Sequence, residues 1–204
     1  MDAVTVSPKY QVDAMSIIDR NVTVTMCRET LTRIPLYPLP PGHQIRAYLP
    51  GDEHEWVRIE STADRFNTIT IELFRREFGD DPTLLAERQF FLLDRRGGVI
   101  GTATAWFDDN HHGHRYGRIH WVAIHPDWQG QGMSKPLLTR VCSRLHELGH
   151  DKAYLVTSTG RINAINLYLQ YGFLPEINGA EDERVWDQVK GHMNELLEAP
   201  GRIL

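Results

Sequence analysis

A glycine-rich segment, residues 129–135, stands where the hydrophobic pattern of the chain changes. The apolar run before it, residues 119–124, is typical of a buried strand. After it, apolar residues recur at helical spacing, which predicts an amphipathic helix beginning near residue 133. The first amides of a helix lack intrahelical partners, and glycines let the backbone approach a phosphate closely. The segment therefore predicts an anion site, although a tight strand–helix turn that binds nothing would show the same pattern.

Two common phosphate-binding loops do not match this segment. The P-loop requires Gly-x-x-x-x-Gly-Lys-Ser/Thr, and residues 130–135, Gly-Gln-Gly-Met-Ser-Lys, have neither that spacing nor that order. The dinucleotide fingerprint requires Gly-x-Gly-x-x-Gly, and Lys135 stands where the third glycine would be. Both nucleotide interpretations are excluded.

The spacing instead resembles the acyl-CoA loop of the GCN5-related N-acetyltransferase (GNAT) superfamily, Gln/Arg-x-x-Gly-x-Gly/Ala. Gln129 and Gly132 are in place, and Ser134 stands at the last position. Residues 164–173, Ala-Ile-Asn-Leu-Tyr-Leu-Gln-Tyr-Gly-Phe, resemble a second block of that family, Ala-x-x-Leu-Tyr-x-x-x-Gly-Phe. The two blocks follow one another in the family's order, and the resemblance extends over residues 43–176.

The resemblance implies an α/β fold with a mixed, centrally splayed β-sheet flanked by helices. It also implies acetyl-CoA as co-substrate, with the end of the central strand pairing with pantetheine and the loop holding the pyrophosphate. The family's pantetheine-binding asparagine has Arg161 at its usual place here, so Asn163 is taken as its nearest equivalent. The expected cofactor-binding residues are Val122, Ala123, Ile124, Gln129, Gly130, Gln131, Gly132, Met133, Ser134, Lys135 and Asn163.

Acetyl transfer from a thioester to an amine requires deprotonation of the amine, stabilisation of an oxyanion and protonation of the departing thiolate. The resemblance implies that Tyr168 donates the last proton, the alternative being a packed aromatic on a helix. It implies His120 as the base, at a position that matches a histidine of the aralkylamine-acetylating branch. A structural histidine, with a water chain as the base, is the alternative. Strand alternation predicts that His120 and Trp121 point to opposite faces.

The predicted hairpin turn 108–116 gathers several potential metal ligands. It contains Asp108, Asp109, His111, His112 and His114. Imidazole and carboxylate groups are common zinc ligands, but a polar turn with Asn and Gly offers no fixed ligand frame. We expect no metal here, and a solvated loop near the acceptor entrance.

The sequence divides into an N-terminal extension, residues 1–42, and a GNAT-like domain, residues 43–204. The extension holds one predicted strand, residues 22–27, and a proline-rich connector, residues 34–42. In the domain, two helices are expected before a hairpin of strands 89–94 and 99–107. The first has Asp52 as N-cap, the second runs over residues 67–78, and the resemblance implies that both overhang the acceptor site.

After the loop helix, residues 152–157 read as a strand, so this helix should form a parallel crossover. Residues 181–198 predict a C-terminal helix where the superfamily usually closes its sheet with a β-hairpin. Strand 22–27 is the segment we expect to cover that sheet edge instead.

Composition limits the classes of function. The chain has 204 residues, 41% of them hydrophobic, and a formal net charge of -5. This charge argues against nucleic acid as a partner, because phosphate contacts need clustered Lys and Arg. No apolar run is long enough to span a membrane, and the start of the chain has no secretion-signal pattern. Two cysteines without disulfide or zinc spacing favour a reducing, cytoplasmic setting.

These observations favour an N-acetyltransferase that moves an acetyl group from acetyl-CoA to a primary amine by direct attack in a ternary complex. The acceptor partner would be a small molecule or a peptide, and a homodimer is left open. The alternative is a non-catalytic acyl-CoA-binding regulatory domain, against which the pair His120 and Tyr168 argues. A scaffold without cofactor is a third alternative, and the intact glycine loop argues against it.

Overall fold

The structure, a computed structural model, describes residues 15–198. A seven-stranded sheet runs in the order β2-β3-β4-β5-β6-β1-β7. Its strands are β1 (Thr23–Arg28), β2 (Gln44–Ala47), β3 (Gln89–Leu93), β4 (Val99–His111), β5 (His114–Ile124), β6 (Ala153–Ser158) and β7 (Leu174–Pro175). The α-helices are α1 (Ile17–Arg20), α2 (Asp52–Ala63), α3 (Ile71–Phe78), α4 (Pro82–Arg88), α5 (Ser134–Glu147), α6 (Ile162–Gln170) and α7 (Ala180–Glu198). Two 3₁₀ turns, η1 (Pro126–Trp128) and η2 (Thr159–Arg161), complete the elements.

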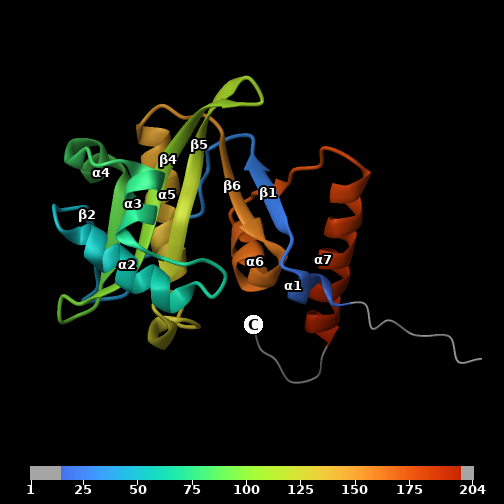
Figure 1. Ribbon diagram of the computed structural model, residues 1–204, viewed down its shortest axis with the longest axis horizontal. Helices are drawn as coiled ribbons and strands as arrows, with labels where there is room; N and C mark the ends of the chain where they lie inside the picture. The colour runs from blue at the N-terminus through green and yellow to red at the C-terminus, as the bar shows by residue number, and fades with distance from the viewer. Residues whose placement is uncertain (1–14, 199–204) are drawn as a thin grey trace, which may run out of the picture.

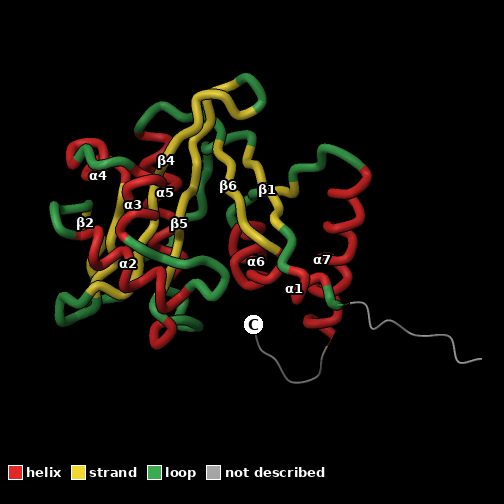
Figure 2. Tube along the Cα trace, in the orientation of Figure 1, coloured by secondary structure: helices red, strands yellow, loops and turns green. Residues whose placement is uncertain are grey.

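Helices cover both faces of the sheet, with α5 behind it and α2 and α3 in front in the view of Figures 1 and 2. The apolar face predicted for α5 is confirmed, since its residues Leu137, Leu138, Val141, Cys142 and Leu145 are all buried. On β4, Gly101 and Ala103 are small residues two positions apart, so they lie on one face of the strand. A Cβ at Gly101 would lie 2.6 Å from Cδ1 of Ile124 and 2.9 Å from the carbonyl oxygen of Ala123, both on β5, so glycine is required there for β4 and β5 to lie close together.

Aromatic side chains fill the space between the sheet and α2 and α3. Trp56 of α2 is completely buried, and its ring centroid lies 5.4 Å from that of Phe74 and 5.7 Å from that of Phe78. The ring of Trp121, on β5, lies 5.2 Å from the same indole. Because large aromatic rings contribute most of the buried area, this cluster fixes α2 and α3 against the central strands.

The parallel strands β5 and β6 pair over only part of their length. Their register begins at Gly117 opposite Ala153 and ends at Ile119 opposite Leu155. Beyond that point the strands diverge, as Figure 1 shows toward the bottom of the view. The predicted central splay is therefore confirmed, and residues 120–124 have no strand partner on the β6 side.

The strand of the N-terminal extension lies inside the sheet. β1 pairs antiparallel with β6 from Thr23 opposite Ser158 to Arg28 opposite Ala153, and with the short β7 on its other side. Helix α7 follows β7 and buries Val185 and Trp186 against the same core. The expectation that strand 22–27 covers this edge is confirmed. Residues 1–14 of the extension lie outside the described range.

Two local predictions differ from the structure, and one helix was not expected. The N-cap of α2 is Gly51, whereas the Asp52 carboxylate accepts the Leu49 amide at 2.6 Å and pairs with Arg46. The second helix begins at residue 71, because the Thr70 side chain caps it. Helix α4 was not predicted, although Asp81 caps it and a proline follows at its first position. Within residues 15–198, no helix combines the length and apolarity needed to cross a bilayer.

Candidate active site

A cavity of about 590 Å³ opens where β5 and β6 diverge. Its walls are the C-terminal end of β5, the glycine loop, the first turns of α6 and the C-terminal part of α2. Of the residues predicted from sequence, it brings together Val122, Ala123, Ile124, Gln129, Gly130, Gly132, Met133, Ser134, Asn163 and Tyr168. Gln131, Lys135 and His120 do not line it.

The glycine loop adopts a conformation that only glycine takes without strain. Gly130 and Gly132 have φ of 73° and 74°, and an added Cβ at either would meet nothing within 4 Å. Gln129 ties the loop to β5 by donating from Nε2 to the carbonyl of Ile124 at 2.8 Å. Among the described residues, the backbone amides of residues 130–133 donate no hydrogen bond. Unpaired amides beside open space, at the start of α5, suit an anion such as a diphosphate.

Lys135 turns away from this loop. Its ammonium lies 5.0 Å from the centroid of the Tyr37 ring, in the proline-rich connector. The hydroxyl of Tyr171 donates to the Lys135 carbonyl at 2.5 Å and lies 2.8 Å from Oγ1 of Thr139. The second tyrosine of the 164–173 block therefore links α6 to the first turn of α5 and helps to position the loop.

Tyr168 lies in the cavity wall, with 7% of its surface exposed. Burial, together with the nearby Glu60 carboxyl, raises the pKa of its phenol well above the usual range, so it is protonated at neutral pH. Within residues 15–198, its hydroxyl has no hydrogen-bond partner. A protonated hydroxyl without a hydrogen-bond partner, on a residue that lines the cavity, can act as a proton donor.

Glu60 is a cavity residue that the sequence analysis missed. It is 3% exposed, and its Oε1 is buried without a hydrogen-bond partner in the described part of the chain. Burial, reinforced by the nearby Asp64 carboxylate, raises its pKa to about 8, while Arg161 opposes the shift. The signal was available, because Glu60 follows Trp56 by four residues and therefore shares the apolar face of α2. A carboxyl on such a face, without an internal partner, indicates function.

An ion pair joins the two walls of the cavity. Nη2 of Arg161 lies 2.7 Å from Oδ2 of Asp64, at the end of α2, and Nη1 donates to Oγ of Ser158 at 2.7 Å. The guanidinium also stacks on Phe66, 4.8 Å from the ring centroid. Arg161, which stands where the family has asparagine, therefore connects α6 to the segment after α2.

The predicted alternation of β5 is wrong at His120 and Trp121. The register against β4 shifts between Thr102 and Thr104, and Trp121 has a φ of 49°. This bulge turns both side chains toward α3, where Nε2 of His120 and the indole nitrogen of Trp121 lie 3.0 and 3.2 Å from Oε2 of Glu77. Alternation assumes an unbroken ladder, and nothing in residues 119–124 marks the bulge.

The electrostatics of this group keep His120 neutral. Burial lowers its pKa, whereas the hydrogen bond from His120 lowers the pKa of Glu77 to about 2. The ionised Glu77 carboxylate therefore accepts a hydrogen bond from the Nε2–H group of a neutral imidazole, and Nδ1 carries the lone pair. Within the described residues, Nδ1 has no hydrogen-bond partner.

Comparison with known proteins identifies the family. The acetyltransferase (GNAT) family matches residues 53–173, which is more than half of the chain. The protein belongs to this family, as the glycine loop, the tyrosine block and the splayed sheet indicate. A GCN5-related N-acetyltransferase from Sphaerobacter thermophilus has a similar fold, with a TM-score of 0.62 and 23% identity over 77% of this chain and 50% of that one.

The curated relatives are longer proteins. Mycothiol acetyltransferases from Cellulomonas flavigena and Streptomyces coelicolor are each 28% identical to this chain, over 66% and 67% of it. The chain spans less than half of their length, 41% and 44% respectively. The ribosomal-protein-S18-alanine N-acetyltransferase of Escherichia coli shares the fold, with a TM-score of 0.52 and 21% identity over 64% of this chain and 76% of that one.

Proposed function

We propose that this protein transfers an acetyl group from acetyl-CoA to a primary amine of a small molecule or peptide, by direct attack within a ternary complex. The observation that carries the proposal is the end of the β5–β6 ladder at Ile119 and Leu155. The cavity that opens there holds the loop amides and Tyr168 together. Membership of the acetyltransferase family supports the same reaction.

The chain's own residues fit the co-substrate. The unpaired amides of residues 130–133 would hold the diphosphate, and the left-handed glycines leave the space beside them free. The backbone of residues 122–124, without a strand partner on the β6 side, would hold the pantetheine amides, with Asn163 in the opposite wall. Acetyl-CoA would supply the thioester that the amine attacks.

Tyr168 is the proposed proton donor to the departing thiolate sulfur. Its support is location and charge state, since it lies in the cavity wall and stays protonated at all physiological pH values. The raised pKa keeps the phenol protonated, so a proton is available beside the thiolate when it forms.

Two groups are candidates for accepting the amine proton, and the cavity favours Glu60. Glu60 lines the same cavity as Tyr168, and its Oε1 has no hydrogen-bond partner within the described residues. The ammonium group of a bound acceptor would therefore pair with the Glu60 carboxylate and lose a proton to it. His120 stays a prediction from the sequence. Its Nδ1 lone pair is suited to the role, but it would act through water, because His120 does not line the cavity.

Thiol release from acetyl-CoA, followed over a panel of amines, tests the proposal. The panel should contain polyamines, amino sugars, aralkylamines and peptides with a free N-terminus. We expect amine-dependent release, and a rate that rises with pH through the Glu60 pKa of about 8. Glu60→Gln should remove this rise, whereas His120→Gln should leave it. Acetyl-CoA binding without amine-dependent release across the panel would favour the regulatory domain instead.

The pH at which the rate rises distinguishes Glu60 from His120 as the base. If His120 were the base, the rate would rise at a pH below 6.5, because burial lowers its pKa from that value. The ionisation of the acceptor amine is common to all variants, so it cancels when Glu60→Gln and His120→Gln are each compared with the wild type.

A further inference from the structure

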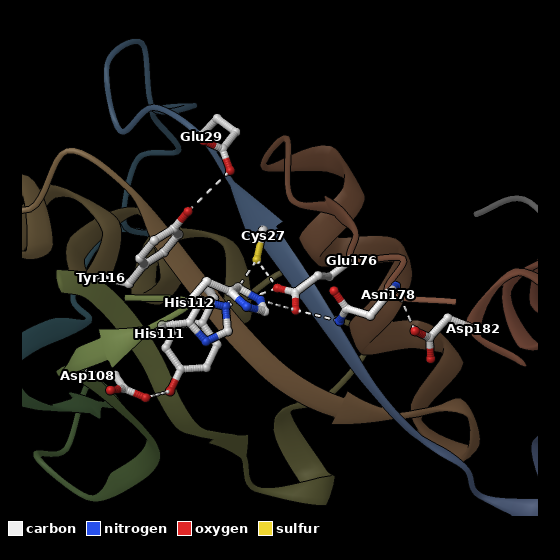
Figure 3. A network of polar contacts seen from close by, with 10 residues as sticks. Cys27, Glu29, Asp108, His111, His112, Tyr116, Glu176, Asn178 and Asp182 are labelled. Atoms are coloured by element: carbon white, nitrogen blue, oxygen red, sulfur yellow. Dashed lines mark hydrogen bonds and ion pairs between the residues drawn. The ribbon is translucent and has the colours of Figure 1, made fainter. Parts of the chain in front are cut away.

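Four potential metal ligands meet at the opposite end of the sheet from the cavity. They come from segments far apart in sequence. Cys27 lies on β1, His111 on the β4–β5 hairpin and Glu176 directly after β7, and His112 joins them through its contact with Glu176. Figure 3 shows their side chains pointing toward one another. None of them lines the cavity that holds Tyr168.

The donor atoms of Cys27, His111 and Glu176 all lie within 4.8 Å of one another, close enough to share one cation. Sγ of Cys27 lies 3.7 Å from Nε2 of His111, which in turn lies 3.0 Å from Oε2 of Glu176. Nε2 of His112 lies 2.7 Å from the other oxygen, Oε1, of the same carboxylate. Around a tetrahedral zinc ion, two ligand atoms lie about 3.3–3.6 Å apart, from metal–ligand distances of about 2.0–2.3 Å. The 2.6 Å contact between Cys27 and Glu176 is a hydrogen bond, and a small rotation of the carboxylate would lengthen it.

Surrounding contacts hold these ligands in place, as the outer partners of metal sites do. The His111 ring stacks on Tyr154, with centroids 3.9 Å apart and planes at 8°. Asn178 donates to Oε1 of Glu176 at 3.0 Å, and the Glu176 amide donates to the Thr25 carbonyl at 3.0 Å. The polar turn alone could not hold these ligands in fixed positions. Contacts with β1 and with the segment after β7 do so.

The hairpin turn and the burial of the side chains also favour a ligand site. His112 and Gly113 have φ of 51° and 77°, as a two-residue turn between the paired residues His111 and His114 requires, and this turn places His112 beside Glu176. The side chains of His111 and Glu176 are only 13% and 14% exposed, whereas that of His112 is 54% exposed. An adjoining cavity of about 690 Å³, lined by Cys27, His112 and Glu176, gives a cation a way in.

We infer that Cys27, His111, His112 and Glu176 bind a divalent cation of the zinc class. Thiolate, imidazole and carboxylate together are a donor set that zinc prefers, whereas magnesium and calcium prefer oxygen alone. On binding, the thiol proton leaves to solvent, and one thiolate and one carboxylate balance the two positive charges. Cys27, His111 and Glu176 supply three ligands, and His112, drawn in from its contact with Glu176, supplies the fourth. A site with four protein ligands is structural, and it joins the N-terminal strand, the hairpin and the C-terminal segment.

Cobalt(II) is the probe for this site, because its spectrum reports both thiolate ligation and coordination geometry. The full-length chain without an affinity tag, stripped with a chelator, is titrated with Co²⁺ and then with Zn²⁺. We expect one equivalent of Co²⁺ to produce a thiolate-to-metal charge-transfer band and the visible bands of a tetrahedral ion, and Zn²⁺ to abolish both. Cys27→Ser should lose the charge-transfer band.

Matched histidine variants make the test specific. His111→Gln should weaken Zn²⁺ binding by at least about 100-fold, since loss of an outer partner alone costs about 10–100-fold. His114→Gln, on the same hairpin and exposed, should bind as the wild type does. Zn²⁺ should raise the Tm of the wild type and of His114→Gln but not of His111→Gln. If a ligand variant fails to fold, the Co²⁺ spectrum of the wild type still tests whether a thiolate binds the metal.

Two results would overturn the inference. One is a wild-type protein that shows no thiolate–cobalt band at micromolar Co²⁺. The other is a band or a Zn²⁺ affinity that survives in Cys27→Ser and His111→Gln. In either case, the four side chains form only a hydrogen-bonded contact between the hairpin and β1.

Discussion

Nε2 of His120 lies 3.0 Å from Oε2 of Glu77, so the histidine of the central strand is tied to α3 rather than directed into the cavity. The bulge at Trp121 makes this possible, because it places two neighbouring side chains of β5 on one carboxylate. The pairing is a structural link between the sheet and the helices over the proposed acceptor site. It also sets the charge states of both partners.

His120 should make the protein less stable in mild acid. Burial lowers its native pKa below the unfolded value of 6.5, so its contribution to stability is complete above pH 6.5 and falls as the pH drops below it. Glu77 adds a loss at lower pH, from 4.5 toward its native pKa of about 2. Urea unfolding at pH 7 and pH 5 should give a smaller difference for His120→Gln than for the wild type. An equal difference in both proteins would contradict a neutral, buried His120.

Tyr168→Phe should lower kcat by about 10²–10⁴-fold, the range of a general acid, with little change in acetyl-CoA affinity. Steady-state thiol release and equilibrium binding measure the two quantities separately. Tyr154→Phe is the control, because its hydroxyl donates to Asp108 at the hairpin end of the sheet. A Tyr168→Phe enzyme with the wild-type kcat would remove this residue as the proton donor.

Asp64→Asn should shift the pH–rate profile to lower pH. The Asp64 carboxylate helps to hold the pKa of Glu60 at about 8, and its neutralisation should let Glu60 ionise more easily. Arg161→Gln should shift the profile in the opposite direction, because the guanidinium opposes the rise. Opposite shifts in the two variants would show that the rise of the rate with pH reports the ionisation of Glu60. Profiles that stay in place in both would contradict Glu60 as the titrating base.

Met26→Ala should destabilise the fold by about 2–5 kcal/mol, the usual cost of truncating a buried methionine. Met26 is completely buried on β1, so this variant tests whether the N-terminal strand is part of the core. Thr23→Ala, at an exposed position of the same strand, should stay within about 0.5 kcal/mol of the wild type. Equal stabilities of the two variants in urea unfolding would show that β1 contributes little.

A feature of the fold or of the site could be predicted from the sequence where its physical cause lies within one short segment. The glycine loop and α5 were predictable, because Gly130 and Gly132 act on their own backbone and the helix period is local. The bulge at Trp121 was not, because it depends on how β5 pairs with β4. Glu60 was overlooked, although its place beside Trp56 on an apolar face was a local signal.

The cluster around Glu176 shows the same limit for tertiary contacts. His111 and His112 were recognised as potential ligands, but Cys27 is 84 residues away from His111, and Glu176 is 65 residues away. The pairing of β6 with β5 on one side and with β1 on the other, together with the pairing of β1 with β7, brings these residues together. The periodicity or spacing of residues within a single segment cannot predict a contact between distant segments.

The central claim is that the amides of residues 130–133 hold the diphosphate of acetyl-CoA. Calorimetric titration with acetyl-CoA tests it most directly, using the wild type, Gly132→Asp and two controls. Gly132→Asn has nearly the same bulk and backbone strain without the charge, and Gly149→Asp adds the same charge at another left-handed glycine, at the far end of α5. We predict that Gly132→Asp binds at least about tenfold more weakly than Gly132→Asn, because a carboxylate repels the phosphates, and that Gly149→Asp binds as the wild type does. Wild-type affinity in Gly132→Asp, or no acetyl-CoA binding by the wild type, would contradict the account.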